Sequence, residues 1–99
     1  MELFETIRLG DLLDVYGQVL TNKKREMLSM YVFDNMSYQE IAENLGISKP
    51  AVLDSIRVAS VKLEDMESKL GFLKFRQSLQ KIVSTSKNIK QDLQKFLKE

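Results

Sequence analysis

The chain offers few side chains for chemistry, because its 99 residues include no cysteine and no histidine. That absence excludes thiol nucleophiles, imidazole bases, disulfides, zinc fingers and soft-metal sites. The carboxylates Glu64, Asp65 and Glu67 cluster in sequence, but on one helix they would point in different directions, which favours a solvated face over a metal site. We therefore expect no enzymatic activity, no cofactor and no bound metal.

The cations are the remaining candidates for recognition, and they are unevenly distributed. The net charge is −3 over residues 1–20, −2 over residues 21–67 and +6 over residues 68–99, which gives +1 for the whole chain. The total argues against a polyanionic partner, whereas the basic end could face one or could be an ordinary solvated helical face.

Apolar residues recur at spacings of three and four along the chain, and the only proline is Pro50, so the sequence predicts an all-α fold. Four helices are expected before Gly71, which should stop the last of them. They run from Phe4 to near Leu20, from Asn22 to before Asp34, from Ser37 through Leu45, and from Ser48 to about Lys69.

The segment from Ser37 to Ile56 has the pattern of a helix-turn-helix. Ser37 and Glu40 fit a capping box, and Gly46 supplies a left-handed turn after a short helix. The small Ala42 permits close helix crossing, and Ser48 can cap the next helix. The alternative is a helical bundle whose short turn happens to contain glycine. The core expected between the two helices is Ile41, Leu45, Ile47, Val52 and Ile56.

The basic tail carries a heptad pattern. Because residues 84–86 form helix poorly, we expect a break there and two helices, at about 72–83 and 87–98. We expect one all-helical domain over residues 1–99, with a helix-turn-helix body at 1–70 and a tail at 71–99. The seam consists of Phe75, Leu79, Ile82, Ser86, Ile89, Leu93 and Phe96.

The stretch from Leu20 to Leu63, and above all Met36 to Ser48, resembles region 4 of the bacterial sigma-70 factors, which reads the promoter −35 element. With Ala51 to Ile56 and Leu63 to Leu70 included, nearly the whole chain resembles the YlxM-like family of small bacterial helix-turn-helix proteins. The resemblance implies a sigma-region-4-like helix-turn-helix bundle with a long recognition helix and a C-terminal helical extension. It also implies a regulatory part in the signal recognition particle pathway and no known catalysis.

If the fourth helix lies in a major groove, its outward N-terminal residues would meet the bases. Lys49 and Arg57 suit phosphate or guanine, whereas Asp54 repels the backbone unless it accepts from a cytosine amino group. The cations at the start of the second helix could add phosphate contacts, as in the sigma-type arrangement. The predicted nucleic-acid-binding residues are Lys23, Lys24, Arg25, Ser48, Lys49, Leu53, Asp54 and Arg57.

Apolar residues on the outer side of the fourth helix suggest a covering surface. Leu53, Val58 and Val61 would be exposed in an isolated unit, so we expect them to pack against the protein's own tail or a second subunit. Our hypothesis is a homodimer built by the fourth helix and the tail. Core packing is favoured over base stacking for Phe72, Phe75 and Phe96, and Tyr16, Tyr31 and Tyr38 should be half-buried with hydroxyls reaching solvent.

Two classes of function stay open. One is a helix-turn-helix regulator of DNA or of signal recognition particle RNA. The other is a helical protein-interaction module that has lost DNA reading and binds the particle's protein component or the transcription machinery. Acidic residues near the N-terminus and the lack of a long apolar run predict a cytoplasmic protein without membrane insertion.

Overall fold

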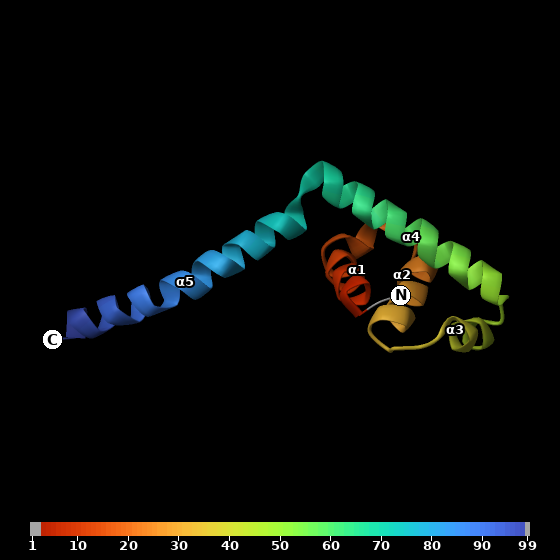
Figure 1. Cartoon of the computed structure of the whole chain (residues 1–99), viewed down its shortest axis with the longest axis horizontal. Coiled ribbons are helices and arrows are strands. Elements are labelled where there is room, and N and C mark those ends of the chain that lie inside the picture. Colours follow the sequence, from red (N-terminus) through yellow and green to blue (C-terminus); the bar gives the residue numbers. More distant parts are fainter. Residues whose placement is uncertain (1–2, 99) are drawn as a thin grey trace.

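The computed structural model describes residues 3–98, with side chains described at residues 4–86 and 91, and all of its regular elements are helical. The all-α prediction is confirmed. Helices α1 to α4 gather into a body, from which α5 extends as an arm (Figure 1). The elements are α1 (Leu3–Tyr16), the short 3-10 helix η1 (Gly17–Val19), α2 (Asn22–Val32), α3 (Tyr38–Leu45), α4 (Lys49–Leu70) and α5 (Phe72–Lys98).

Hydroxyl side chains start three of the helices, and the caps at Ser37 and Ser48 were predicted from the sequence. Thr21 Oγ1 accepts from the amide of Lys24 at 3.3 Å, before α2. Ser37 and Glu40 form the complete capping box of α3, with both hydrogen bonds at 3.1 Å. Ser48 Oγ accepts from the amide three residues ahead at 3.2 Å, at the start of α4. Each bond satisfies a backbone donor that the helix itself leaves free.

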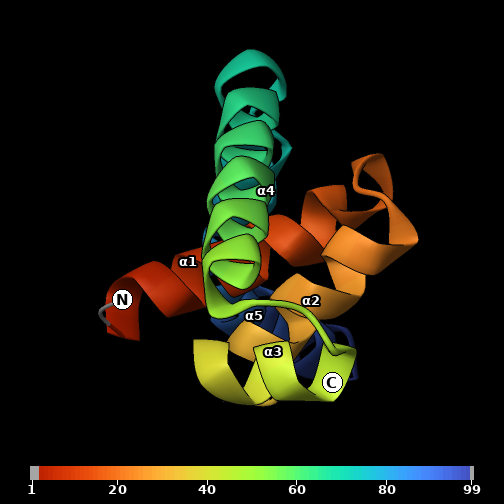
Figure 2. The ribbon, with the colours of Figure 1, turned by 90° about the vertical axis from the view of Figure 1, so that its right-hand side faces the viewer.

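The core lies where α1, α2 and α3 meet the inner side of α4. Leu12, Leu28, Ile41, Val52 and Leu63 are fully or almost fully buried there, and Figure 2 shows α1 and α2 crossing behind α4 while α3 lies below its N-terminal end. The predicted helix-turn-helix core is confirmed, since it belongs to this one cluster.

The first helix ends earlier than predicted. It stops at Tyr16, and the chain tightens into η1 before reaching Leu20. A Cβ atom on Gly17 would lie 3.3 Å from Leu13 Cδ1 and 3.8 Å from Arg25 Cδ. Glycine at this position therefore leaves room for the Leu13 side chain of α1, whereas Arg25 of α2 lies at ordinary contact distance.

The predicted break at residues 84–86 is wrong, because α5 runs without interruption from Phe72 to Lys98. Thr85 Oγ1 donates to the carbonyl of Lys81 at 2.9 Å, and Ser86 Oγ donates to the carbonyl of Val83 at 3.2 Å. These hydroxyls bond to the preceding turn of their own helix, so they do not compete with its amide ladder. The side chains of Ile89, Leu93 and Phe96 lie outside the described residues.

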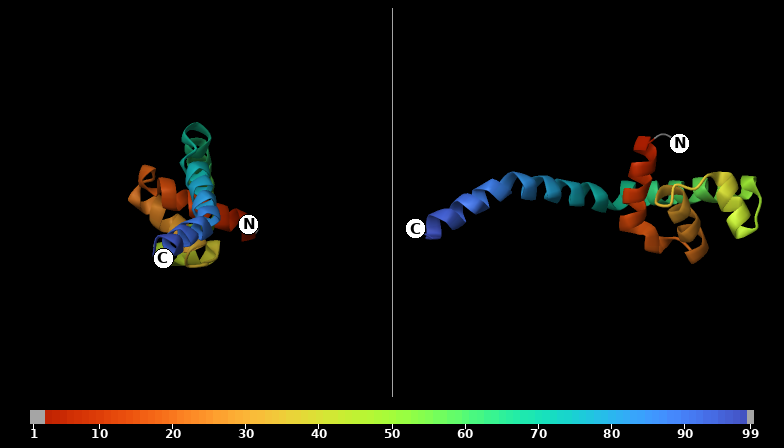
Figure 3. Two further views of the ribbon diagram at one scale, coloured as in Figure 1. Left: turned by 90° about the vertical axis from the view of Figure 1, so that its left-hand side faces the viewer. Right: turned by 90° about the horizontal axis from the view of Figure 1, so that it is seen from below.

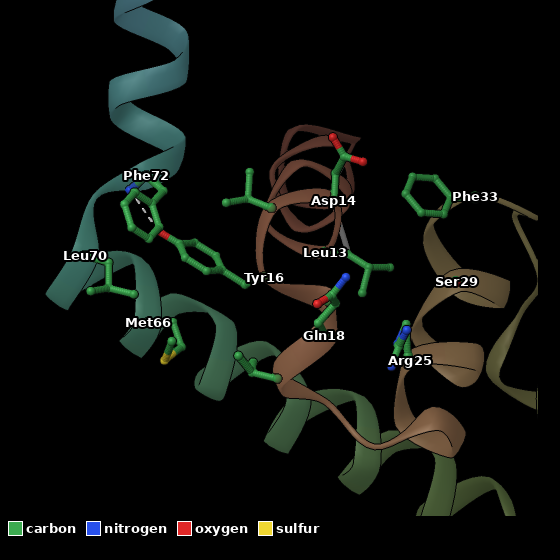
Figure 4. A pocket seen from close by; sticks show the side chains of 13 residues that line it. Leu13, Asp14, Tyr16, Gln18, Arg25, Ser29, Phe33, Met66, Leu70 and Phe72 are labelled. Atoms are coloured by element: carbon green, nitrogen blue, oxygen red, sulfur yellow. Dashed lines mark hydrogen bonds between the residues drawn. The ribbon is translucent and has the colours of Figure 1, made fainter.

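The junction between α4 and α5 is held by two side chains from different helices. Glu67 Oε1 accepts from the hydroxyl of Tyr16 at 2.6 Å. The same carboxylate accepts from two of the first amides of α5, at Leu73 (3.0 Å) and Lys74 (3.1 Å). The Tyr16 hydroxyl in turn accepts from the amide of Phe72 at 2.9 Å (Figure 4). We call this arrangement the Glu67 joint; with Gly71 left-handed at φ 64°, it fixes where α5 begins.

The joint also changes the properties of its two side chains. Tyr16 is only 4% exposed and its hydroxyl is fully engaged, so the expectation of a half-buried, solvent-reaching tyrosine is wrong at this position. The bond from Tyr16 and the amides of α5 hold the pKa of Glu67 below its ordinary value. The carboxylate is therefore stabilised in its charged form at neutral pH.

The arm gives the molecule an elongated shape. Its extents are 66 × 27 × 24 Å and its radius of gyration is 18.7 Å, whereas a compact chain of this length would have about 13 Å. Beyond its first turns α5 runs clear of the body in different views (Figures 1 and 3). Within one chain, therefore, the tail does not cover the N-terminal half of α4.

Candidate nucleic-acid interface

Helices α3 and α4 form the helix-turn-helix, and three features set the angle between them. Gly46 is left-handed at φ 68°, which turns the chain immediately after α3. Ala42 is 3% exposed, so it provides the small surface on which the helices approach. The amide of Ile47 donates to the carbonyl of Ala42 at 3.0 Å and seats the turn. The N-terminal end of α4 consequently projects beside α3 at the edge of the body (Figure 2).

The structure brings together the predicted residues of α4 on one side of its first turns. Ser48, Lys49, Leu53, Asp54 and Arg57 are all exposed. The Ser48 hydroxyl accepts a hydrogen bond as the helix cap, which leaves its own proton free to be donated to a ligand. This stretch therefore offers hydrogen-bond donors and cations next to the positive end of a helix dipole.

Arg57 and Asp54 limit the positive charge of that surface. Arg57 Nη2 lies 2.8 Å from Asp54 Oδ1, and both side chains are exposed. An exposed pair of this kind contributes little to stability and can open when a stronger anion arrives. A phosphate could displace Asp54 from Arg57, whereas a base contact would have to accommodate both groups.

The predicted cations of α2 do not behave alike. Lys23 is exposed and Lys24 is half-buried. Arg25 Nη2 donates to Asn22 Oδ1 at 3.1 Å, and the side chain lines a pocket of about 530 Å³ together with Met66 and Leu70. Figure 4 shows Arg25 in this pocket between α1 and α2. Arg25 therefore lines a pocket with residues from the C-terminal half of α4, and that pocket includes none of the predicted residues at the start of α4. We call those residues, Ser48, Lys49, Leu53, Asp54 and Arg57, the first-turn group.

A shallow apolar groove lies along the side of α4 that carries Leu53, Asp54 and Arg57. It has a volume of about 550 Å³. Leu53 and Val61 are 42% and 63% exposed, which confirms that the outer side of α4 carries uncovered apolar groups. Sequence reasoning missed the contribution of Tyr38, whose position at the start of α3 gives no local sign of what it faces. The lining residues are Tyr38, Pro50, Leu53, Asp54, Ile56, Arg57, Ser60 and Val61.

Two tyrosines support one wall of this groove. The rings of Tyr31 and Tyr38 stack with centroids 4.9 Å apart and planes 5° apart, and the Tyr38 hydroxyl donates to that of Tyr31 at 3.3 Å. Burial, with the bond from Tyr38, raises the pKa of Tyr31 to about 12. Both side chains are half-buried as predicted, but their hydroxyls are bonded to each other.

Other kinds of site find no support in the part of the chain that the structure describes. No group of three or more acidic side chains there could hold a metal ion. Likewise, no helix within residues 3–98 has both the length and the apolar composition needed to cross a membrane.

Comparisons with known proteins agree with the helix-turn-helix geometry. Residues 3–99 match the model of a family described as "Putative helix-turn-helix protein, YlxM / p13 like". Proteins named UPF0122 from Bacillus thuringiensis (strain Al Hakam), Bacillus mycoides (strain KBAB4) and Bacillus anthracis (strain A0248) are each 38% identical over 87 residues. These matches cover 88% of this chain and 79% of each relative.

Proposed function

The chain belongs to the YlxM/p13-like family of helix-turn-helix proteins, and we propose that it is a cytoplasmic regulatory protein that binds nucleic acid through the N-terminal half of α4. The family description is that of a helix-turn-helix protein and not of an enzyme. The observation that carries the proposal is the exposed first-turn group of α4, held at a fixed angle by α3 and the Gly46 turn.

In this proposal the predicted residues divide into two kinds of contact. Lys49 and Arg57 bind phosphate or guanine, and the Ser48 hydroxyl donates to a phosphate oxygen. Leu53 contacts base edges, and Asp54 accepts from a cytosine amino group when Arg57 leaves it. On α2, Lys23 and Lys24 bind the backbone, and Arg25 joins them only if its side chain leaves the pocket.

The number of cations sets the expected salt dependence. Lys49 and Arg57 alone would release about two counterions, so affinity should fall about tenfold between 50 and 200 mM salt. With Lys23 and Lys24 included, the loss over the same range would be about 150-fold. The salt slope therefore measures whether α2 takes part.

Fluorescence anisotropy with duplex DNA and with signal recognition particle RNA, at both salt concentrations, tests the proposal. Arg57→Ala should weaken binding about tenfold and lower the salt slope by about one. Arg57→Ala removes the cation and also leaves the Asp54 carboxylate unpaired. Comparison with a double Asp54→Ala, Arg57→Ala variant, which removes both groups, shows how much of the lost affinity comes from the unpaired carboxylate. Lys62→Ala is the matched control, since it removes an exposed cation farther along α4. Equal effects at Arg57 and Lys62, or binding that ignores salt, would contradict the proposal.

We further propose that the regulated system is the signal recognition particle pathway, with the particle's RNA as the ligand to test beside DNA. The support for this assignment is the resemblance to the YlxM-like family. A preference for particle RNA over an unrelated hairpin of equal length, measured at physiological salt, is the expected result. Equal affinity for both RNAs would remove the assignment while leaving general nucleic-acid binding intact.

A second function is favoured by the groove beside α4. Its apolar lining and the Asp54–Arg57 pair suit a protein surface better than a polyanion. In this alternative the chain binds the particle's protein component or part of the transcription machinery. Salt-tolerant binding that is lost in Val61→Glu but kept in Lys49→Ala would favour this function over nucleic-acid reading.

We also propose that the protein acts as a homodimer. Helix-turn-helix proteins commonly bind as dimers whose two recognition helices contact two half-sites. The uncovered apolar groups on α4 and α5 support self-association. A sedimentation mass that stays at 11.5 kDa at tens of micromolar protein would contradict it.

A further inference from the structure

The described part of α5 carries an apolar stripe that stays largely exposed among the described residues, although Phe72 at its start stacks on Tyr16 with ring centroids 6.3 Å apart. Phe75, Leu79 and Ile82 lie on one side of the helix at heptad spacing, and Phe72 and Val83 lie beside them. Their exposed fractions are 54% for Phe72, 62% for Phe75, 45% for Leu79, 61% for Ile82 and 64% for Val83. We call these five residues the α5 stripe. Contiguous exposed apolar side chains of this size mark an interaction surface more often than isolated ones do.

The arm also lacks support from its own body. Its contacts with the body are at its start, where Leu73 is buried and Arg76 Nη1 lies 2.7 Å from Asp14 Oδ2. Beyond that point α5 runs clear of the other helices (Figures 1 and 3). In proteins most helical stability comes from tertiary packing of an amphipathic face, and the exposed side of α5 is such a face without packing beyond its first turns.

The charges of the arm are placed so that a second identical helix can approach. Lys74 and Lys81 each precede a heptad residue and lie about 100° round the helix from it, on the outer side. The positions that flank the stripe are Ser78 and Thr85, together with Arg76, which is already paired with the body. The stripe is therefore not bordered by unpaired cations, as a surface for phosphate or an anionic membrane would be.

The described part of the α5 stripe supplies about two thirds of the area that a stable dimer needs. Phenylalanine buries roughly 150–250 Å² when fully covered, so Phe72 and Phe75 could each lose on the order of 100 Å² of exposed surface. The whole α5 stripe would contribute on the order of 400 Å² per copy, or roughly 800 Å² for two copies. In the sequence, the same spacing continues at Ile89, Leu93 and Phe96, which would bring the total toward the roughly 1,200 Å² of a stable interface.

We propose that the α5 stripe binds the α5 stripe of a second copy, forming a two-helix coiled coil outside the helix-turn-helix bodies. This deepens the homodimer of the proposed function and rests on it, since it names the surface that joins the copies. The grooves beside α4 stay open in such a dimer, because the arms meet each other and not the bodies.

A pair of lysine substitutions tests the interface in the full chain. Ile82→Lys places a charge in the stripe, whereas Gln80→Lys places the same charge on the outer side of the same turn. Both residues are exposed in a single chain, so neither change disturbs the core of the body. By sedimentation velocity, wild type and Gln80→Lys should form a dimer of 11.5 kDa chains at tens of micromolar, and Ile82→Lys should dissociate at least 100-fold more readily.

A second variant separates this interface from the groove. Val61→Lys lies on α4 and should leave the dimer intact. If both Val61→Lys and Ile82→Lys abolish the dimer, the arm binds the partner's groove and the proposal is overturned. If wild type dimerises and Ile82→Lys does so equally, the α5 stripe is not the interface, although the homodimer stands. Nucleic-acid binding, measured separately, reports on the proposed function whichever result is obtained.

Loss of helix provides an independent readout. If the arm is supported by its partner, Ile82→Lys should lower the far-ultraviolet helical signal, and dilution of wild type should lower it in parallel with dissociation. An unchanged helical signal in a monomeric Ile82→Lys variant would contradict the requirement for a partner along α5.

Discussion

Removal of the Glu67 carboxylate is the sharpest test of how the arm is oriented. In Glu67→Ala, α5 loses the acceptor for its amides at Leu73 and Lys74, and the buried Tyr16 hydroxyl loses the acceptor for its proton. Of the side-chain hydrogen bonds of the Glu67 joint, only the one from the amide of Phe72 to the Tyr16 hydroxyl would remain. We therefore expect α5 to fray at its start and to lose its fixed angle to α4.

The size of the effect follows from the bonds that are lost. Loss of a helix N-terminal cap costs about 1–2 kcal/mol, which for a domain of this size lowers the melting temperature by roughly 4–16 °C. The matched control is Glu64→Ala, one turn earlier on α4. Glu64 is an exposed carboxylate whose partner is Arg8 at 2.9 Å, and an exposed pair contributes less than about 1 kcal/mol.

The pH dependence of the unfolding free energy shows whether the charge of the Glu67 carboxylate, and not only the packing of its side chain, stabilises the joint. The pKa of Glu67 is lowered in the folded protein, chiefly by the hydrogen bond from Tyr16. Its contribution to stability is therefore complete above the ordinary pKa of 4.5 and is lost as pH falls through the lowered value. The stability difference between wild type and Glu67→Gln should be largest at neutral pH and should close in acid.

The orientation itself can be measured because the chain has no native cysteine. Spin labels at Asn44→Cys on α3 and Gln80→Cys on α5, diluted with unlabelled protein, report the distance from body to arm. We expect a narrow distance distribution in wild type and in Glu64→Ala, and a broad one in Glu67→Ala. A narrow distribution in Glu67→Ala, with an unchanged melting temperature, would refute the role given to the joint.

Three further predictions concern the body. Leu63→Ala, at a fully buried position, should cost about 2–5 kcal/mol in urea unfolding, and a loss below 1 kcal/mol would mean that the core packs differently. Ser37→Ala should remove about 1 kcal/mol at neutral pH; because the capping box lowers the pKa of Glu40, this loss should shrink in acid, and a pH-independent loss would count against it. Tyr31, with its pKa raised to about 12, should remain largely protonated at pH 11 when ionisation is followed at 295 nm, and stability should fall as pH rises from 10 toward 12; a titration complete by pH 11 would contradict this.

The starts of α3 and α4 and the stops after them could be predicted because their signals are local. Ser37 and Glu40 satisfy each other's amides within one turn, so four consecutive residues contain the whole motif. Gly46 and Gly71 are left-handed where the sequence placed helix stops. Such features depend little on what the rest of the chain packs against.

Features that depend on distant residues could not be predicted in this way. Tyr16 and Glu67 are 51 positions apart, and neither position alone indicates a hydrogen bond between them. The predicted break in the tail was wrong for a different reason. Low helix propensity near residue 85 reflects competition of Ser and Thr hydroxyls with the backbone, but in α5 the hydroxyls of Thr85 and Ser86 donate to carbonyls of the preceding turn and, among the described residues, accept from no amide of the helix.

The charge pattern links self-association to nucleic-acid binding. The N-terminal half of α4 provides only Lys49 and Arg57 as cations in each copy, and Arg57 is paired with Asp54. If α4 alone makes the phosphate contacts, a single copy would release about two counterions, whereas two joined copies would release about four and lose affinity with salt about twice as steeply on a logarithmic scale. If the arms pair as proposed, the Glu67 joint, which sets the angle between each body and its arm, would also set how far apart the two α4 helices lie. Specific binding should consequently depend on α5 and Glu67, although neither touches the nucleic acid.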